Sequence, residues 1–552
     1  MKSLTIYPIL ILFCLTLYVP GLFSLPPTDR DESRYAQSSR QMLEDNDFVG
    51  IRFQDRPRHK KPVGIYWLQA ASAAATGMAG HNRIWPYRIP SLLGAVAAVL
   101  LTFYFGRRLF GRDTAFLGAA LAAGSLLLIA QAHLATTDAV LLAASVAAQG
   151  ALALSYTGAS QGRRKNSAWW VFWAAQGIGI LVKGPILPFF SALTIGALLI
   201  ADRRAGWLKS LRPAAGIPLA LAITAPWFIA VQAATEGRFL LEGVLGDLLP
   251  KIVSGHESHG FPPGYYLLLM SVTCWPMSIF TLPAAFHAWR RRLRPEIRFC
   301  LAWIVPAWVV FEIVPTKLPH YLLPLYPAMA LLTANAIIHV ARGPENLLHT
   351  RAARIGFAIW SLVTVAIAGV SIVLPWLITG GFKAGSLWPA GTAVIILCVV
   401  ISRIARERPM AAVVAALAGT ALMLAPVLQN TLPAMNELWL SRAVAEAVER
   451  HTGKPPYRAA PLAAAGYHEP SLVFLCGTRT SLTTPKGAAR HLARHSGALA
   501  VVSNDLDPDF HAAMASLGQK AALVETLHGL NYTKGRRMTL RLYALDPART
   551  NP

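Results

Sequence analysis

The chain has 552 residues, of which 54% are apolar and only 14% charged, so an ordinary soluble globular protein is excluded. Its net charge of +24 would suit a nucleic-acid-binding protein, but the excess of basic residues lies in short loops between apolar runs, which argues against that class. Four of the five cysteines lie inside apolar runs and Cys476 stands alone, so no disulfide framework and no CxxC metal pair is predicted.

Apolar runs of about 18–22 residues recur along the chain and predict a polytopic α-helical membrane protein. The first run has a basic start but no small-residue cleavage pattern, so a retained helix is favoured over a cleaved signal peptide. About thirteen spans are predicted: 4–25, 86–106, 114–131, 137–156, 168–182, 186–201, 213–234, 264–288, 299–314, 320–340, 355–378, 387–402 and 410–428. We therefore expect a transmembrane domain over 1–430.

Arginine and lysine clusters fill every second short loop, as in 107–112 and 290–294. The positive-inside rule places these loops on the cytoplasmic side. The alternate loops, above all the long loop 26–85, then face outward, together with everything after about residue 430. Loop 26–85 carries two stretches with helical spacing, 31–45 and 62–78, which are predicted to lie in the membrane interface, although such pieces also serve as plain lipid anchors.

The tail over 431–552 is predicted to be a small α/β domain outside the membrane, because its apolar runs are of strand length and alternate with helical stretches. The predicted strands are 459–465, 472–475, 498–503, 521–527 and 538–545, and the predicted helices are 437–451, 485–495 and 507–517.

An acid pair, Asp31 and Glu32, follows the first span directly. A carboxylate at a membrane surface can act as a general base for an acceptor hydroxyl or phosphate. The alternative is that Asp31 caps the helix that follows, since aspartate is a favoured N-cap. A second acid, Asp138, stands at the outer end of another span, where it needs a partner, a cap or a chemical role.

Three lysines, Lys61, Lys183 and Lys317, lie in outer loops at the starts or ends of helices, and together they predict a pocket for a phosphate or diphosphate. Attraction to anionic headgroups and snorkelling are the alternatives. His256 and His259 have the i, i+3 spacing of ligands for a divalent metal, whereas a solvated loop is the other interpretation. No Walker, GxGxxG or GxSxG pattern follows a predicted strand, so no nucleotide cofactor is expected.

These motifs resemble the aminoarabinose (lipid A) transferase family of GT-C membrane glycosyltransferases, which are related to the protein O-mannosyltransferases. The resemblance is carried by the string Asp-Glu-Ser-Arg-Tyr-Ala at 31–36, by Lys-Pro at 61–62 and by Lys-Leu-Pro-His-Tyr-Leu-Leu-Pro at 317–324. It covers nearly the whole chain.

The resemblance implies an inverting enzyme that moves a sugar from a polyprenyl monophosphate carrier to a lipid A, protein or other envelope acceptor, on the periplasmic face of the bacterial inner membrane. The sugar would be aminoarabinose or another pentose or hexose. Asp31 takes the place of the catalytic aspartate, Lys61 that of the lysine that grips the carrier phosphate, and Asp138 that of the second acid of the cavity. Arg34 and Tyr35 would line the same cavity.

One position departs from the family. Well-known members have an acid directly before the lysine of Lys-Pro, where it helps to hold a metal, and this chain has Lys60. Two other classes of function stay open: a transporter or flippase for a lipid-linked sugar, which should show internal repeats, and a non-catalytic envelope-assembly protein that binds through its tail.

Overall fold

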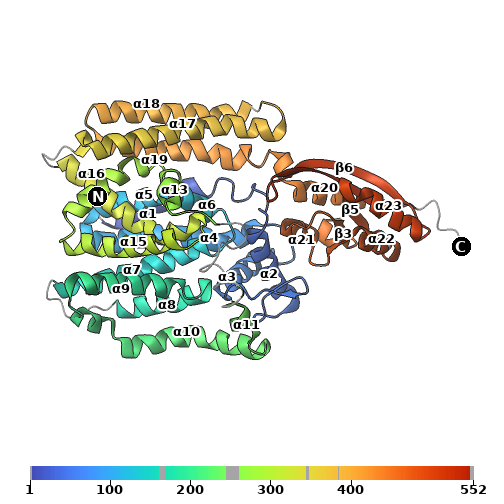
Figure 1. The fold of residues 1–552 in the computed structure, drawn as a ribbon, viewed down its shortest axis with the longest axis horizontal. Coiled ribbons are helices and arrows are strands. Elements are labelled where there is room, and N and C mark those ends of the chain that lie inside the picture. Colours follow the sequence, from blue (N-terminus) through green and yellow to red (C-terminus); the bar gives the residue numbers. More distant parts are fainter. Residues whose placement is uncertain are drawn as a thin grey trace.

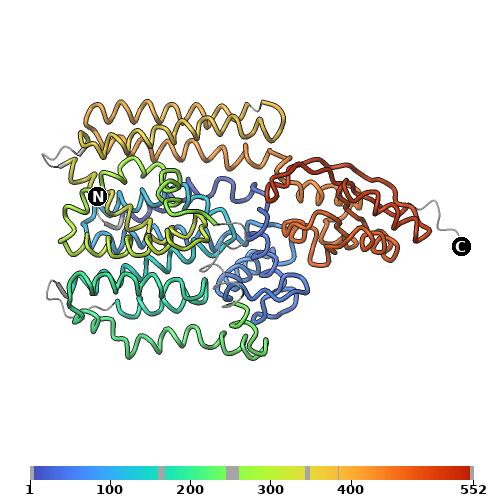
Figure 2. Tube along the Cα trace, in the orientation of Figure 1, coloured from blue at the N-terminus to red at the C-terminus, as the bar shows by residue number. Residues whose placement is uncertain are grey.

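The computed structural model describes residues 3–160, 168–243, 246, 260–342, 347–382 and 384–546. A bundle of apolar helices makes up most of the molecule, and a five-stranded sheet with its own helices lies at one end of the bundle (Figure 1). Helices α2 (Asp31–Asp45) and α3 (Gly64–Ala75) lie where the bundle meets that sheet (Figures 1 and 2).

The bundle consists of α1 (Ser3–Tyr18), α4 (Trp85–Phe110), α5 (Arg112–Ala123), α6 (Leu126–Ala132), α7 (Asp138–Ser160), α8 (Trp169–Lys183), α9 (Ile186–Asp202), α10 (Pro213–Ala234), α11 (Arg238–Leu241), α13 (Tyr265–Thr273), α14 (Ser278–Arg290), α15 (Pro295–Ile313), α16 (Tyr326–Arg342), α17 (Arg351–Thr379), α18 (Leu387–Ala405) and α19 (Pro409–Pro426). Short turns join them, including the 3-10 helices η1 (Gly206–Leu211), η4 (Pro319–Leu325), η5 (Leu347–His349), η6 (Ala384–Ser386) and η8 (Asn436–Leu438) and the π-helical turn η7 (Val427–Thr431).

Within the described ranges, 7 helices are long and apolar enough to cross a membrane, or 8 if the bent pair α5–α6 is one span. The chain is therefore a multi-pass membrane protein, while the predicted number of about thirteen spans is not confirmed. Some predicted spans are short helices, such as α8 with 15 residues. Others are broken: 114–131 is α5 and α6, which bend by 63°, and 264–288 is α13 and α14.

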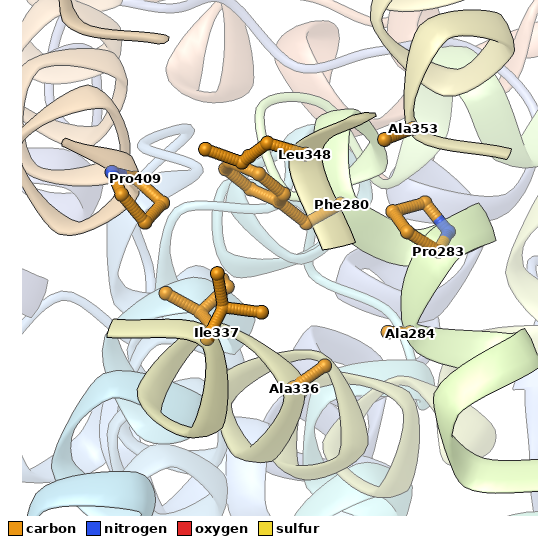
Figure 3. A pocket seen from close by; sticks show the side chains of 9 residues that line it. Phe280, Pro283, Ala284, Ala336, Ile337, Leu348, Ala353 and Pro409 are labelled. Atoms are coloured by element: carbon orange, nitrogen blue, oxygen red, sulfur yellow. The ribbon is translucent and has the colours of Figure 1, made fainter. Parts of the chain in front are cut away.

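A small apolar crevice lies between α14, α16 and α17 (Figure 3). Its lining residues are Phe280, Pro283, Ala284, Ala336, Ile337, Val340, Leu348, Ala353 and Pro409. None of these side chains carries a polar atom, so the crevice offers no group for catalysis.

The sheet module, residues 440–546, has the strand order β4-β3-β5-β7-β6. The strands are β3 (Leu462–Ala465), β4 (Ser481–Thr483), β5 (Leu499–Ser503), β6 (Ala521–Asn531) and β7 (Arg536–Leu545), and the helices are α20 (Leu440–Thr452), α21 (Pro470–Cys476), α22 (Pro485–Arg494) and α23 (Asp507–Ser516), with the 3-10 turns η9 (Pro456–Arg458) and η10 (Asn504–Leu506). Strand β3 pairs in parallel with β4 and β5, and β7 pairs antiparallel with β5 and β6.

The prediction of a strand at 472–475 is wrong, because these residues lie inside α21. A short buried apolar run does not distinguish a strand from a helix by periodicity, and Pro470 in the first turn favours the helix. The module is not separate from the bundle: one buried apolar cluster includes Phe474 and Leu440 of the module together with Ala36 of α2 and Tyr87 of α4.

Helix α2 has the bounds that the sequence predicts, but most of its polar side chains are buried rather than solvated. Arg40 donates to the carbonyl of Phe474 at 3.1 Å, and Gln37 donates to Thr478 at 2.8 Å. The polar face of α2 therefore contacts the sheet module, and its other neighbours include α3 and the short strand β1 (Arg52–Phe53).

Two glycines allow close backbone approach near the loop ends of the bundle. A Cβ on Gly94 of α4 would lie 2.8 Å from the backbone of Ala139 in α7, and a Cβ on Gly64 of α3 would lie 2.8 Å from the carbonyl oxygen of Leu181 in α8. Larger side chains at these positions would push the helices apart. The start of α7, the start of α3 and the end of α8 are thereby held close to their neighbours.

A fully buried ion pair ties these segments together. Arg88 of α4 donates from Nε and Nη2 to the two carboxylate oxygens of Glu32 at 2.7 and 3.0 Å. The same guanidinium donates to the carbonyls of Leu25 and Pro26 at 2.8 and 2.9 Å. Glu32 also accepts from the backbone N–H of Ala135 at 2.9 Å, just before α7.

Burial opposes the ionisation of Glu32, but the charge of Arg88 and the hydrogen bonds from Arg88, Thr28 and Ala135 hold its pKa below the ordinary value. The pair is therefore ionised at neutral pH. It fixes α2, the segment before it, α4 and the start of α7 relative to one another.

Replacing Arg88 by Met should leave the charge of Glu32 buried without its partner and should lower the free energy of unfolding by about 3–5 kcal/mol. The double variant Glu32→Gln/Arg88→Met should recover part of that loss, because the lone charge is gone. Denaturation of the full chain in detergent micelles measures both. Arg442→Met, which breaks an exposed pair with Glu446, is the control and should change stability by about 1 kcal/mol or less. If Arg88→Met were as stable as Arg442→Met, the structural role of the buried ion pair would be contradicted.

Candidate active site

Asp31 lies in the first turn of α2, directly before the buried Glu32. The N-cap residue is Arg30, and no side chain caps the helix, so the alternative role of Asp31 as a cap is not what the structure shows. The carboxylate is 64% exposed, and its Oδ1 lies 3.7 Å from Nη2 of Arg58. An exposed acid next to a fixed cation can reach a substrate.

Arg58 itself is buried, with 9% of its side chain exposed. Its guanidinium carbon lies 5.3 Å from the ring centre of Tyr35, and its Nε donates to the hydroxyl of Tyr66 at 3.3 Å. The two tyrosine rings, from α2 and α3, are 5.3 Å apart. Arg58 is thus held in a fixed place between the two helices, next to Asp31.

Asp138, the first residue of α7, forms a second group with two cationic or titratable side chains. Its Oδ1 lies 2.5 Å from Nζ of Lys183, at the end of α8, and 3.9 Å from Nε2 of His320 in η4. The carboxylate is nearly buried, with 8% exposed. Asp138 is paired and therefore differs from Asp31.

The two groups belong to one site. The charge of Lys61 acts on both Asp138 and His320, and the charge of Asp31 also acts on His320. The cations of this cluster are Arg58, Lys61 and Lys183, and its carboxylates are Asp31 and Asp138. With His320 neutral, these named groups sum to one net positive charge, which suits a single anion.

Arg34 lines an open groove of about 800 Å³ beside this cluster. The groove is also lined by Phe53, Arg56, Pro57, Arg58, His59, Lys60, Glu242 and Gly246. One acid, Glu242, pairs with His59 at 2.9 Å. The remaining charged residues of the lining are cationic, so the groove favours an anionic ligand.

Lys317 is placed differently from the other predicted cations. Its side chain is buried, and its ammonium donates to the carbonyls of Phe261 and Val314, both at 2.8 Å. These bonds join the segment before α13 to the end of α15. The structure gives Lys317 backbone partners rather than a place beside Asp138.

The metal prediction rests on His256 and His259, which lie outside the described residues. Among the residues that are described, no group of three or more His, Cys, Asp or Glu side chains is arranged to hold a metal ion. The described part of the site therefore does not supply a ligand set, and a divalent metal stays a prediction.

The sequence alone did not identify Arg58 and His320 as members of the cluster around Asp31 and Asp138, nor Arg88 as the partner of Glu32. Arg58 stands three residues before Lys61 in a basic run, and His320 stands in the Lys-Leu-Pro-His-Tyr string, so both had a local signal. Arg88 had none, because its partner Glu32 is 56 residues away.

Asp29, two residues before Asp31, faces the sheet module. Its carboxylate accepts a hydrogen bond from Ser471. Burial raises the pKa of Asp29 to about 6; the hydrogen bond from Ser471 opposes that rise, and the nearby charge of Glu469 adds to it.

The sequence matches the family described as dolichyl-phosphate-mannose-protein mannosyltransferase over residues 60–229. The undecaprenyl phosphate-α-4-amino-4-deoxy-L-arabinose arabinosyl transferase of Pseudomonas paraeruginosa is 29% identical over 337 residues, which are 59% of this chain and 60% of that protein. Its counterpart in Pectobacterium carotovorum is 29% identical over 380 residues, 68% of this chain and 66% of that protein. The chain thus spans 60% and 66% of the length of these two curated relatives.

Among solved structures, ArnT from Cupriavidus metallidurans bound to undecaprenyl phosphate matches with a TM-score of 0.75 at 20% identity, over 98% of this chain and 97% of that chain. The resemblance to the aminoarabinose transferases of the GT-C class is therefore confirmed. The fold is shared over nearly the whole chain.

The raised pKa of Asp29 predicts that the folding stability of the chain depends on pH. Its folded pKa of about 6 lies above the ordinary 3.8, so the stability it contributes is complete below pH 3.8 and is lost as the pH rises through 6. Asp29→Asn cannot ionise. Its unfolding temperature relative to the wild type should rise between about pH 4 and 6 and stay level above about pH 7. The exposed Asp45→Asn is the control. A difference that does not depend on pH would contradict the raised pKa.

Proposed function

We propose that this chain is an inverting glycosyltransferase that moves a sugar from a polyprenyl monophosphate carrier to an envelope acceptor. The observation that carries the proposal is the exposed carboxylate of Asp31 beside the cationic cluster of Arg58, Lys61 and Lys183. An acid that can reach an acceptor and cations that can hold a phosphate are the two parts that this reaction needs.

The carrier phosphate binds at the cationic cluster. Lys61 grips it, as the resemblance implies, and Arg34, Tyr35 and Lys183 line the same cavity. Positive charge placed there is worth most when the phosphate departs, because the leaving group then gains negative charge. We add Arg58 to this set, since its guanidinium is fixed by two tyrosines. Lys317 joins the segment before α13 to the end of α15 through its bonds to backbone carbonyls.

Asp31 takes a proton from the acceptor hydroxyl, or orients an acceptor that is already ionised. The acceptor oxygen forms a bond to the anomeric carbon while the bond from that carbon to the carrier phosphate oxygen breaks. The electron pair of the broken bond stays with the phosphate, and attack from the opposite side inverts the anomeric configuration. Asp138 holds Lys183 and His320 in place and belongs to the cavity.

The names of the similar proteins indicate which carrier and which sugar to propose as substrates. The curated relatives are arabinosyl transferases named for undecaprenyl phosphate-α-4-amino-4-deoxy-L-arabinose, and the solved ArnT structure holds undecaprenyl phosphate. We therefore propose undecaprenyl phosphate as the carrier, aminoarabinose or another pentose or hexose as the sugar, and lipid A as the first acceptor to test, ahead of proteins and other envelope lipids.

The orientation follows from the charges of the loops. The alternation of basic loops supports about thirteen spans with the site and the sheet module on the outer side. The resemblance to the aminoarabinose transferases implies that this membrane is the bacterial inner membrane and that its outer side is periplasmic. A carrier lipid would then reach the cavity sideways from the outer leaflet.

Asp31→Asn should reduce transfer to the background level while the chain still folds and binds donor, because the carboxamide cannot take a proton. The assay measures transfer of radiolabelled sugar from the polyprenyl phosphate donor to total envelope lipid, by the full chain in nanodiscs. Asp45→Asn, at the exposed end of the same helix, should transfer at the wild-type rate. Full transfer activity in Asp31→Asn would contradict the assignment of Asp31 as the general base.

Lys61→Met should raise the KM for the lipid donor about 10- to 100-fold, because a charge-assisted hydrogen bond to phosphate is worth about 1.5–3 kcal/mol. Turnover at saturating donor should fall as well if the lysine also stabilises the leaving phosphate. The exposed Lys454→Met in the sheet module serves as the matched control. An unchanged donor KM in the Lys61 variant would contradict the proposed phosphate site.

A further inference from the structure

Directly before Asp31, and outside the cationic cluster, the chain contacts the sheet module. We propose that the turn between β6 and β7, through Tyr532 and Thr533, holds the backbone N–H of Asp29 and the guanidinium of Arg30 and thereby positions the carboxylate of Asp31. The inference rests on the proposed role of Asp31 and assigns to the sheet module a part in turnover.

Two hydrogen bonds reach from this turn to the segment before Asp31. The backbone N–H of Asp29 donates to the hydroxyl of Tyr532 at 2.7 Å. The guanidinium of Arg30 donates from Nη2 to the backbone carbonyl of Thr533 at 2.9 Å. With the bond from Ser471 to the carboxylate of Asp29, both residues that precede Asp31 are held by the module.

The backbone at Arg30 is strained. Its φ is 63° and its ψ is −109°, a region that favours glycine. Such a conformation is unfavourable for a residue that carries a side chain, and it persists only where the surroundings fix it. The contacts of Arg30 and Asp29 with Tyr532 and Thr533 are those surroundings. Because Arg30 is bonded directly to Asp31, relaxation at Arg30 would turn the start of α2 and move the carboxylate.

On its other side, Asp31 is followed by Glu32, which is fixed by Arg88 in the bundle. Asp31 is thus held between one anchor in the bundle and one in the module. The exposed carboxylate needs these two anchors, because its ion-pair partner Arg58 lies at 3.7 Å, too far for a hydrogen bond that would fix its direction. A catalytic group must be held within a few tenths of an ångström to keep its rate.

The turn is itself held by a network of polar side chains around buried Glu469. Buried Glu469 accepts from the side-chain amide of Asn531 at 2.9 Å, and its Oε1 lies 2.8 Å from the hydroxyl of Thr533. Asn531 closes the hairpin opposite Arg536 and is itself buried. Hairpin tips are usually solvated and mobile. A buried polar network at this tip suits a part that must hold something still.

Simple docking of the module is the competing explanation. The buried apolar cluster that joins Phe474 to Tyr87 already docks the module without the turn. Docking alone therefore does not require a strained Arg30, nor bonds to the residues adjoining Asp31. Tyr532 and Arg30 are, on this account, positioning residues and do not touch the substrate.

The test compares Arg30→Ala, Arg30→Lys and Tyr532→Phe with the wild type, using the full chain in nanodiscs and the polyprenyl phosphate sugar donor. Arg30→Ala and Tyr532→Phe should each lower kcat about 10-fold or more while the donor KM stays within about threefold, since the phosphate cluster is intact. Arg30→Lys, which can still donate to the Thr533 carbonyl, should recover part of the rate. Arg450→Ala, which breaks an exposed pair with Glu525 in the module, is the control and should keep the wild-type kcat.

Hydrogen exchange of the backbone amides over 29–32 gives a readout that does not depend on turnover. Exchange should quicken in Arg30→Ala and Tyr532→Phe and not in Arg450→Ala. Wild-type kcat in both variants, with Asp31→Asn inactive, would overturn the positioning role and leave the transferase proposal standing. Absence of transfer by the wild type would count against the transferase proposal. In that case quicker exchange in the two variants supports the anchor at Arg30, and unchanged exchange overturns it.

Discussion

The buried ion pair between Glu32 and Arg88 is the interaction on which the rest of the site depends. Removing two charges from water is expensive, and here the cost is offset by a two-point contact and by further bonds to Ala135, Leu25 and Pro26. Because Glu32 and Arg88 lie in α2 and α4, and their further partners lie in the segment before α2 and just before α7, the pair sets the distance between α2 and the start of α7. Asp31 adjoins one end of this arrangement and Asp138 follows the other.

Three acids of one region thus have three environments and three roles. Glu32 is buried and held ionised by Arg88, so it is a structural anchor. Asp138 is nearly buried and paired with Lys183 at 2.5 Å. Asp31 alone of the three is exposed, at 64%. The environment, and not the residue type, decides which of the three carboxylates is accessible.

The sequence pattern alone predicted part of this arrangement of helices and charged side chains. The bounds of α2 and the shared face of Asp31, Lys61, Asp138 and Lys183 followed from helical spacing and from the alternation of basic loops. Pattern could not separate Glu32 from Asp31, because the partner that distinguishes them, Arg88, lies on another helix. Pattern also did not place the ammonium of Lys317 on the carbonyl of Phe261, which is 56 residues away. The helix at 472–475 was missed for another reason, because a short buried apolar run does not distinguish a strand from a helix by its periodicity. The number of spans also depends on bends and breaks, such as that between α5 and α6, which hydropathy does not reveal.

The most direct test of the central claim is an experimental structure of the full chain with undecaprenyl phosphate in a lipid nanodisc. The phosphate should lie within about 4 Å of the side-chain nitrogens of Lys61 or Arg58, with the carboxylate of Asp31 on the side of the phosphate oxygen that carries the sugar in the donor. A phosphate bound elsewhere, for example on the lipid-facing surface of α10, with the Asp31 region unoccupied, would contradict the account.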